Sequence, residues 1–159
     1  MALLYRLAVA ADLPNLLWLE EESFAQDRIS VRSFRRLIAA PSARLLVVEG
    51  DGELQGYALL LLRRGLDIAR LYSLAISRQA QGQGLGGALL ERCEQLASAR
   101  GCRRLRLEVR LDNASAIGLY ERSGYHRFAR SPGFYEDGSD AWRYEKTLGT
   151  PVPTARNPA

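Results

Sequence analysis

Four glycines gather in residues 81–87, which read Gln-Gly-Gln-Gly-Leu-Gly-Gly and lie between an apolar run and a strongly periodic helical pattern. Glycines leave the backbone bare, so its N–H groups can approach a ligand closely. The helix expected after them points the positive end of its dipole at the same place. These features predict an anion site, and we interpret the anion as the pyrophosphate of a cofactor.

One interpretation of this loop is a nicotinamide dinucleotide site. Gly82, Gly84 and Gly87 match the fingerprint G-x-G-x-x-G, and Glu108 follows at about the distance where that motif has an acidic residue. Two features argue against it. The loop falls in the middle of the chain rather than in an opening βαβ unit, and Glu108 lies inside a strand pattern rather than at a strand end.

Hydrophobic periodicity and turn residues predict the elements that must position this loop. Asp12 is the expected N-cap of the first helix and Ser30 that of the second, and Gly101 is the expected C-cap of the long helix. The order of strands and helices indicates a mixed α/β sheet with helices on both faces. The expected strands cover residues 4–9, 45–49, 54–62, 67–76, 103–111, 125–130 and 141–148, and the long helix covers residues 85–100.

Composition indicates one globular domain. The chain has 159 residues, a net charge of +4 and a pI of about 9.4, without a long basic stripe, so nucleic acid is not indicated. Cys93 and Cys102 are expected to be free, buried thiols. We expect no signal peptide and no membrane span, and a cytoplasmic location by default. Residues 1–149 are the expected domain, and the proline-rich residues 150–159 are expected to be a disordered tail or linker.

The chain resembles the GNAT acyltransferases, which use acetyl-coenzyme A. Their pyrophosphate loop reads Arg/Gln-x-x-Gly-x-Gly/Ala, which residues 81–86 match, and residues 73–77 are similar to the family's strand beside the pantetheine arm. A second signature is matched by Leu-Glu-Val-Arg at residues 107–110 and by the segment from Asn113 to Tyr125. The resemblance implies a mixed, mostly antiparallel sheet of about seven strands with helices on both faces.

Within the family, the chain is most similar to the ribosomal-protein alanine N-acetyltransferases, in residues 107–110 and 134–141. It departs from that subgroup at residues 24–33, which lack the usual tryptophan, in the region where the acceptor would dock. The resemblance implies acetyl-CoA as donor and no metal. The residues expected to bind the coenzyme are Leu74, Ala75, Ile76, Gln81, Gly82, Gln83, Gly84, Leu85, Gly86, Gly87 and Asn113.

Acetyl transfer to an amine requires a base for the amine, an acid for the thiolate and stabilisation of the oxyanion. Glu108 is the candidate base, although Arg106 and Arg110 flank it on the same face and are able to lower its pKa. Tyr120 is the candidate acid, with a phenol held close to the departing thiolate. Backbone N–H groups near Ala75 are candidates for polarising the thioester carbonyl.

Each assignment has a structural alternative. In the structural alternative, Glu108 is a solvated strand carboxylate paired with arginine. Tyr120 would only pack a short helix on the sheet, and Asn113 would only cap that helix. The acidic runs at residues 20–22 and 136–140 either steer a cationic acceptor or are solvated faces.

The sequence therefore predicts an N-acetyltransferase that moves acetyl from acetyl-CoA to a primary amine, a protein or peptide N-terminus, by direct attack in a ternary complex. The alternatives are an enzyme for small-molecule amines and a non-catalytic acyl-CoA binding module. No nucleic-acid or membrane partner is expected, and the sequence does not specify the acceptor or the oligomeric state.

Overall fold

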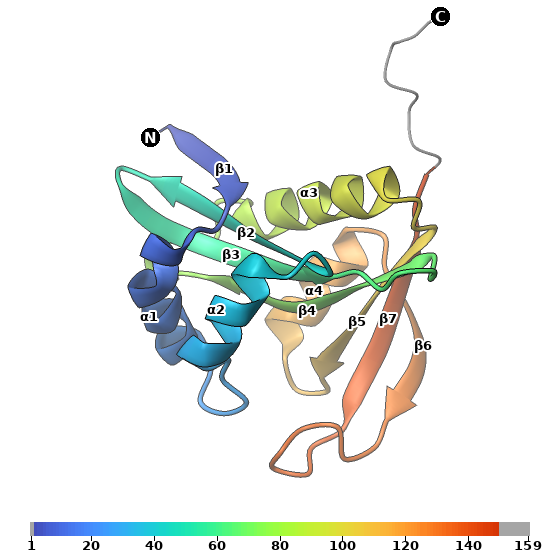
Figure 1. The fold of residues 1–159 in the computed structure, drawn as a ribbon. Helices are drawn as coiled ribbons and strands as arrows, with labels where there is room; N and C mark the ends of the chain where they lie inside the picture. Colours follow the sequence, from blue (N-terminus) through green and yellow to red (C-terminus); the bar gives the residue numbers. More distant parts are fainter. Residues whose placement is uncertain (1, 150–159) are drawn as a thin grey trace, which may run out of the picture.

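A computed structural model describes residues 2–149, which build a seven-stranded sheet covered by helices on both faces (Figure 1). Across the sheet the strands follow the order β1-β2-β3-β4-β5-β7-β6, and every neighbouring pair is antiparallel except β4 and β5. The expected mixed, mostly antiparallel sheet is confirmed. The strands are β1 (Leu3–Leu7), β2 (Ala43–Gly50), β3 (Glu53–Leu61), β4 (Ile68–Ile76), β5 (Arg104–Arg110), β6 (His126–Ser131) and β7 (Ala141–Thr147). The helices are α1 (Leu13–Ser23), α2 (Val31–Ala39), α3 (Leu85–Ala99) and α4 (Ala114–Arg122), with short 3-10 helices η1 (Ala10–Asp12) and η2 (Arg78–Ala80).

Two hydrophobic clusters hold the layers together, one on each face of the sheet. Alternate residues of a strand point to opposite faces. In β3, Ala58 and Leu60 therefore join the cluster under α3 and α4, whereas Tyr57 and Leu59 join the cluster under α1 and α2. All four are fully buried, so β3 appears in the sequence as an almost continuous apolar run.

Local signals in the sequence explain several boundaries. Ser30 caps α2 as expected, because its Oγ accepts a hydrogen bond from the Ser33 N–H at 3.1 Å. The turn between β2 and β3 places Asp51 and Gly52 at positive φ, the geometry of a tight hairpin. Asp12 occupies the N-cap position of α1 as expected, but its carboxylate makes no capping hydrogen bond to that helix. It contacts the Arg6 guanidinium instead, 2.8 Å from Nη1.

Helix α3 buries most of the face that its periodicity predicts. Leu85, Leu89 and Cys93 are buried as the periodicity predicts. At the end of the helix the buried residue is Ala97, whereas the Leu96 side chain is only partly covered. Cys93 and its fellow cysteine, Cys102, are both free and buried, as expected. No helix within residues 2–149 is both long enough and apolar enough to cross a bilayer. The predicted tail at residues 150–159 lies outside the described residues.

An opening in the sheet arises where β4 and β5 part. Both strands start side by side, and residues 68–71 pair with residues 104–107 in the only parallel ladder of the described sheet. Beyond Leu71 and Leu107 the two strands diverge, while β4 keeps its pairing with β3 as far as Ile76. The gap exposes one edge of β4 and brings the start of α4 beside it (Figure 1).

Candidate active site

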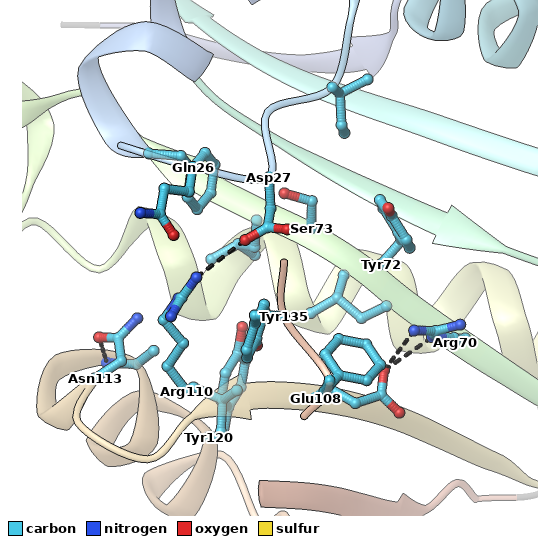
Figure 2. A pocket seen from close by; sticks show the side chains of 17 residues that line it. Gln26, Asp27, Arg70, Tyr72, Ser73, Glu108, Arg110, Asn113, Tyr120 and Tyr135 are labelled. Atoms are coloured by element: carbon cyan, nitrogen blue, oxygen red, sulfur yellow. Dashed lines mark hydrogen bonds and ion pairs between the residues drawn. The ribbon is translucent and has the colours of Figure 1, made fainter. Parts of the chain in front are cut away.

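A cavity of about 290 Å³ lies at the point where β4 and β5 separate (Figure 2). Three parts of the fold line it: the diverging strands, which provide Ser73 and Glu108; helix α4, which provides Tyr120; and two loops. One loop follows α1 and brings Asp27, and the other joins β6 to β7 and brings Tyr135. Segments far apart in the sequence therefore meet here.

Glu108 is held firmly at this cavity by two arginines. Its Oε1 lies 2.9 Å from Nε and 2.8 Å from Nη2 of Arg70, and its Oε2 lies 3.1 Å from Nε of Arg143. The Glu108 side chain is only 7% exposed, so it is not a solvated strand carboxylate. Two cations therefore fix the carboxylate in one orientation.

The arginines expected to flank Glu108 have other partners. Arg106 pairs with Glu145, and Arg110 pairs with Asp27 and Asp137. The reason is strand geometry. Residues two apart on one strand are separated by about 6.6 Å, whereas a directly opposed residue on the next strand is closer. Arg143 stands opposite Glu108 in the β5–β7 register.

Tyr120 lies at the boundary between this cavity and the cleft beside the glycine loop, and it lines both. The residue is 7% exposed, and its ring packs edge-on against Tyr125 at 6.0 Å between centroids. Within residues 2–149 its hydroxyl forms no hydrogen bond with the protein. Burial raises the pKa of the Tyr120 phenol, which therefore keeps its proton available for donation.

A buried polar chain that the sequence did not reveal reaches the cavity through Ser73. The Ser73 and Tyr57 hydroxyls lie 2.7 Å apart, and the Tyr57 hydroxyl donates a hydrogen bond to the Glu20 carboxylate. The other Glu20 oxygen accepts from the Ile29 N–H at 2.7 Å. Burial raises the pKa of the Glu20 carboxyl, although the hydrogen bonds from Tyr57 and Ile29 oppose this effect. Glu20, at 2% exposure, therefore anchors a loop and does not steer an acceptor.

Arg110 ties the two loops together across one side of the cavity (Figure 2). Its Nη2 lies 3.0 Å from Oδ2 of Asp27, and its Nη1 lies 3.0 Å from Oδ2 of Asp137. The other Asp27 oxygen accepts from the Glu136 N–H at 3.2 Å. The guanidinium also stacks on the Tyr135 ring, 4.1 Å from its centroid. One strand residue thus fixes the positions of both loops.

The glycine loop presents a row of unused donors. Within residues 2–149, the backbone N–H groups of residues 82–87 donate no hydrogen bond to the protein, and α3 starts without a side-chain cap. Gly82 and Gly84 have φ of +81° and +80°, a conformation that side chains rarely adopt, and a Cβ at either would meet no atom within 4 Å. Free N–H groups, open space and a helix N-terminus fit a diphosphate.

The remaining loop residues differ in what they do. A Cβ at Gly86 would lie 3.1 Å from Cδ2 of Leu119, so this glycine permits the close packing of α3 on α4. Gln81 donates from Nε2 to the Ile76 carbonyl at 3.3 Å and closes the loop. Gln81, Leu85, Gly86 and the other expected coenzyme residues line the cleft, with the exception of Gln83.

The exposed edge of β4 supplies further backbone donors. The Ser77 N–H bonds to the Gln55 carbonyl of β3, so alternation along the strand turns Ala75 toward β3 as well. Leu74 and Ile76 then direct their N–H groups into the gap between β4 and β5. Of the three expected strand residues, these two are placed to polarise a carbonyl or to pair with an extended ligand.

Asn113 caps α4, since its Oδ1 accepts from the Ala116 N–H at 3.1 Å. Its role as a helix cap is therefore confirmed. Its amide NH2 remains on the side that faces both the cavity and the loop cleft, which Asn113 lines. Among residues 2–149, no group of three His, Cys, Asp or Glu side chains is arranged to hold a metal ion.

The fold and the site together define an acyl-CoA-dependent acetyltransferase. A sequence model described as the acetyltransferase (GNAT) family matches residues 10–125. The chain belongs to the GNAT family, as the resemblance predicted, and it is an N-acetyltransferase that uses acetyl-CoA. The alternative of a nicotinamide site at residues 82–87 is wrong.

Relatives agree with this assignment. A Bacillus subtilis protein, provisionally named as an alanine N-acetyltransferase of ribosomal protein bS18, is 33% identical over 131 residues, 82% of this chain and 85% of that protein. The crystal structure of the ribosomal-protein-S18-alanine N-acetyltransferase from Escherichia coli superposes with a TM-score of 0.82 at 27% identity, covering 98% of this chain and all of that one. The PaiA N-acetyltransferase of Thermoplasma acidophilum, solved with coenzyme A, shares the fold with a TM-score of 0.81 at 20% identity, over 93% of this chain and 100% of that one.

Proposed function

We propose that the chain acetylates the α-amine of a protein or peptide N-terminus by direct attack in a ternary complex. The observation that carries the proposal is the position of Tyr120. This residue lines both the cleft of the glycine loop and the cavity between β4 and β5, which we call the acceptor cavity. A donor bound on one side and an amine bound on the other would therefore meet at one phenol. The names of the two alanine N-acetyltransferase relatives support the choice of acceptor.

The coenzyme would lie along the gap between β4 and the start of α4. The free N–H groups of residues 82–87 would hold its pyrophosphate, and the N–H groups of Leu74 and Ile76 would face its pantetheine arm and thioester carbonyl. The Asn113 amide would donate a hydrogen bond to the same arm. Bound in this way, acetyl-CoA supplies an acetyl thioester at the edge of the acceptor cavity.

Glu108 would act as the base, through a water molecule. Its carboxylate is oriented by Arg70 and Arg143, and it faces the cavity that would contain the amine. An α-amine has a pKa of about 8, so only a modest base is needed at neutral pH. As the amine nitrogen bonds to the carbonyl carbon, its proton passes to Glu108 and the carbon–sulfur bond breaks.

Tyr120 would donate its proton to the departing thiolate. The phenol is buried, keeps its proton and has no protein acceptor within residues 2–149, which leaves its hydroxyl free for the sulfur. Tyr120→Phe keeps the ring packing and removes only the donor. We expect kcat to fall about 100-fold, with the KM for acetyl-CoA within about twofold of wild type.

A thiol-release assay tests the acceptor class. Peptides with different N-terminal residues are compared with free polyamines and aminoglycosides, and acetylated products are identified by mass spectrometry. Turnover of peptides and not of free amines is expected. Turnover confined to small amines would overturn the proposal, and binding of acetyl-CoA without any turnover would indicate the non-catalytic module.

We also propose that residues 1–149 act as one acetyltransferase domain and that it works in the cytoplasm. The two free, buried thiols support a reducing compartment.

A further inference from the structure

A second groove continues from the acceptor cavity along β4, on the side away from the glycine loop. It borders α2 and the connection between β3 and β4, and shares Ile29, Arg70 and Tyr72 with the cavity. The cleft of the glycine loop shares Phe24 and Tyr120, among others, with the same cavity. The cavity thus connects the coenzyme cleft with this groove.

The groove is strongly basic. Five arginines and three serines line it, and no acidic residue does so among the described residues. The arginines are Arg28, Arg36, Arg63, Arg64 and Arg70. Only Arg70 is neutralised, by Glu108, while Arg28 donates to the backbone carbonyls of Phe24 and Glu21.

The three remaining arginines have no carboxylate partner. Within residues 2–149, Arg36, Arg63 and Arg64 form no ion pair, and all three are exposed. Several arginines on the sheet, by contrast, are matched with acidic residues, as Arg110 is with Asp27. Uncompensated positive charge in a groove attracts anionic groups and raises their local concentration.

The other side of the cavity is obstructed. Arg110 bridges Asp27 and Asp137 there, and the Tyr135 ring stacks on it. A polypeptide whose amine reaches Glu108 would therefore continue past Tyr72 and into the basic groove. Of residues 2–149, only one aromatic residue, Tyr72, lines the groove. This disfavours single-stranded nucleic acid, since that ligand usually stacks on several aromatic rings.

Resting on the proposed function, we propose that this basic groove is a specificity subsite for acidic side chains of the acceptor polypeptide. The path along β4 from Tyr72 back to Ile68 covers about 13 Å, the span of about four extended residues. Arg63 and Arg64 follow immediately beyond. Acidic residues at about positions 4 to 6 of the acceptor, counted from the acetylated N-terminus, would reach them.

Matched peptides test the subsite. Two peptides share their first three residues and carry glutamate or glutamine at positions 4 to 6, and a third ends after the shared three residues. We expect wild type to favour the glutamate peptide about tenfold in kcat/KM at low salt, through KM, and to lose most of this preference in about 0.5 M salt.

Two double variants locate the effect. Arg63→Gln with Arg64→Gln should reduce the preference to about twofold and leave turnover of the three-residue peptide unchanged. Arg32→Gln with Arg35→Gln removes the same charge from exposed residues of α2 outside the groove, and should keep the preference.

Each contrary result has a distinct meaning. Equal kcat/KM for the glutamate and glutamine peptides, or equal effects of the two double variants, would overturn the subsite while the proposed function stands. Inhibition by polyuridylate that the groove variant relieves, without a preference for the glutamate peptide, would assign the groove to nucleic acid instead. Failure to acetylate any peptide, including the shortest, would overturn the proposed function and the subsite with it.

Discussion

At the scale of single residues, the proposed chemistry depends on how Glu108 is held. Arg70 and Arg143 each form an ion pair with one oxygen of the Glu108 carboxylate, and the Glu108 side chain is almost completely buried. These contacts keep the proposed base aimed at the cavity. Because an α-amine loses its proton near pH 8, orientation contributes more here than basicity.

Glu108→Gln should lower kcat/KM for a peptide about 100-fold at pH 7. The defect should shrink toward pH 9, because an amine that is already neutral no longer needs the base. The measurement is a pH profile of kcat/KM for wild type and variant. A defect of constant size across the profile would show that Glu108 has only a structural role.

Arg106→Gln is the matched control for this variant. Arg106 lies on the same strand, but it pairs with Glu145 and does not line the cavity. We expect its kcat/KM to stay within about twofold of wild type, since a partly exposed ion pair contributes little. A loss comparable to that of the Glu108 variant would point to damage of β5 itself.

Glu20 is a second residue whose environment has a measurable consequence. The pKa of its carboxyl is raised by burial in the folded chain, whereas an unfolded chain leaves it near 4.3. Between these two values the folded protein retains a proton that the unfolded chain has lost. The contribution of Glu20 to stability is therefore complete below the unfolded pKa and declines as the pH rises through the folded pKa.

Glu20→Gln should cancel this decline, because the amide stays neutral at every pH. Its oxygen can still accept from the Ile29 N–H, and its NH2 can donate to the Tyr57 hydroxyl. Urea unfolding across pH 4 to 8 should show the variant gaining stability relative to wild type as the pH rises. A stability difference that is independent of pH, or that changes in the opposite direction, would refute the raised pKa.

At the scale of elements, β4 must approach β3 closely for its far edge to face the coenzyme. Gly56 of β3 permits this approach: a Cβ there would lie 2.8 Å from the Ala75 carbonyl oxygen and 2.7 Å from Cδ1 of Ile76. The backbone at Ala75 and Ile76 would have to move. Those residues border the exposed edge that is proposed to contact the thioester.

Gly56→Ala should therefore destabilise the protein by about 1–3 kcal/mol and weaken acetyl-CoA binding. Gly118→Ala in α4 is the control: its Cβ would meet the movable guanidinium of Arg122 at 2.9 Å, so alanine should stabilise the helix by about 0.5–1 kcal/mol. Denaturant unfolding and calorimetric titration measure both effects. An unchanged affinity in the Gly56 variant would contradict the role of this close approach.

At the scale of the whole molecule, one splayed pair of strands organises three connected spaces. The glycine-loop cleft, the acceptor cavity and the basic groove follow one another, with shared lining residues at each junction. The divergence of β4 and β5 after Leu71 creates the first two, and the opposite end of β4 borders the third. Under the proposed function, donor and acceptor would therefore enter from opposite sides.

Much of this architecture is visible in the sequence because it depends on local rules. The Asp51-Gly52 turn, the Ser30 cap and the glycines at residues 82 and 84 each have a conformational signature that one chain segment displays by itself. The glycine loop is predicted from such a signature, whereas the roles of Glu108, Tyr120 and Asn113 are proposals that rest on the resemblance to the GNAT family.

The residues that sequence patterns missed depend on long-range register. Arg70 and Arg143 reach Glu108 from neighbouring strands, and Asp27 reaches Arg110 across 83 positions of the chain. Glu20 stands in an acidic run, so no local pattern distinguishes it from its exposed neighbour Glu21. Pairing of this kind follows only from the assembled sheet.

Amide hydrogen exchange, measured by NMR with and without acetyl-CoA, tests the central claim that free backbone donors hold the coenzyme. The N–H groups of residues 82–87 donate no hydrogen bond to the described protein, and those of Leu74 and Ile76 point away from β3. All of them should therefore exchange rapidly in the free enzyme. We predict that acetyl-CoA slows exchange at these positions. Unchanged exchange there, with protection appearing at a different surface, would contradict the account.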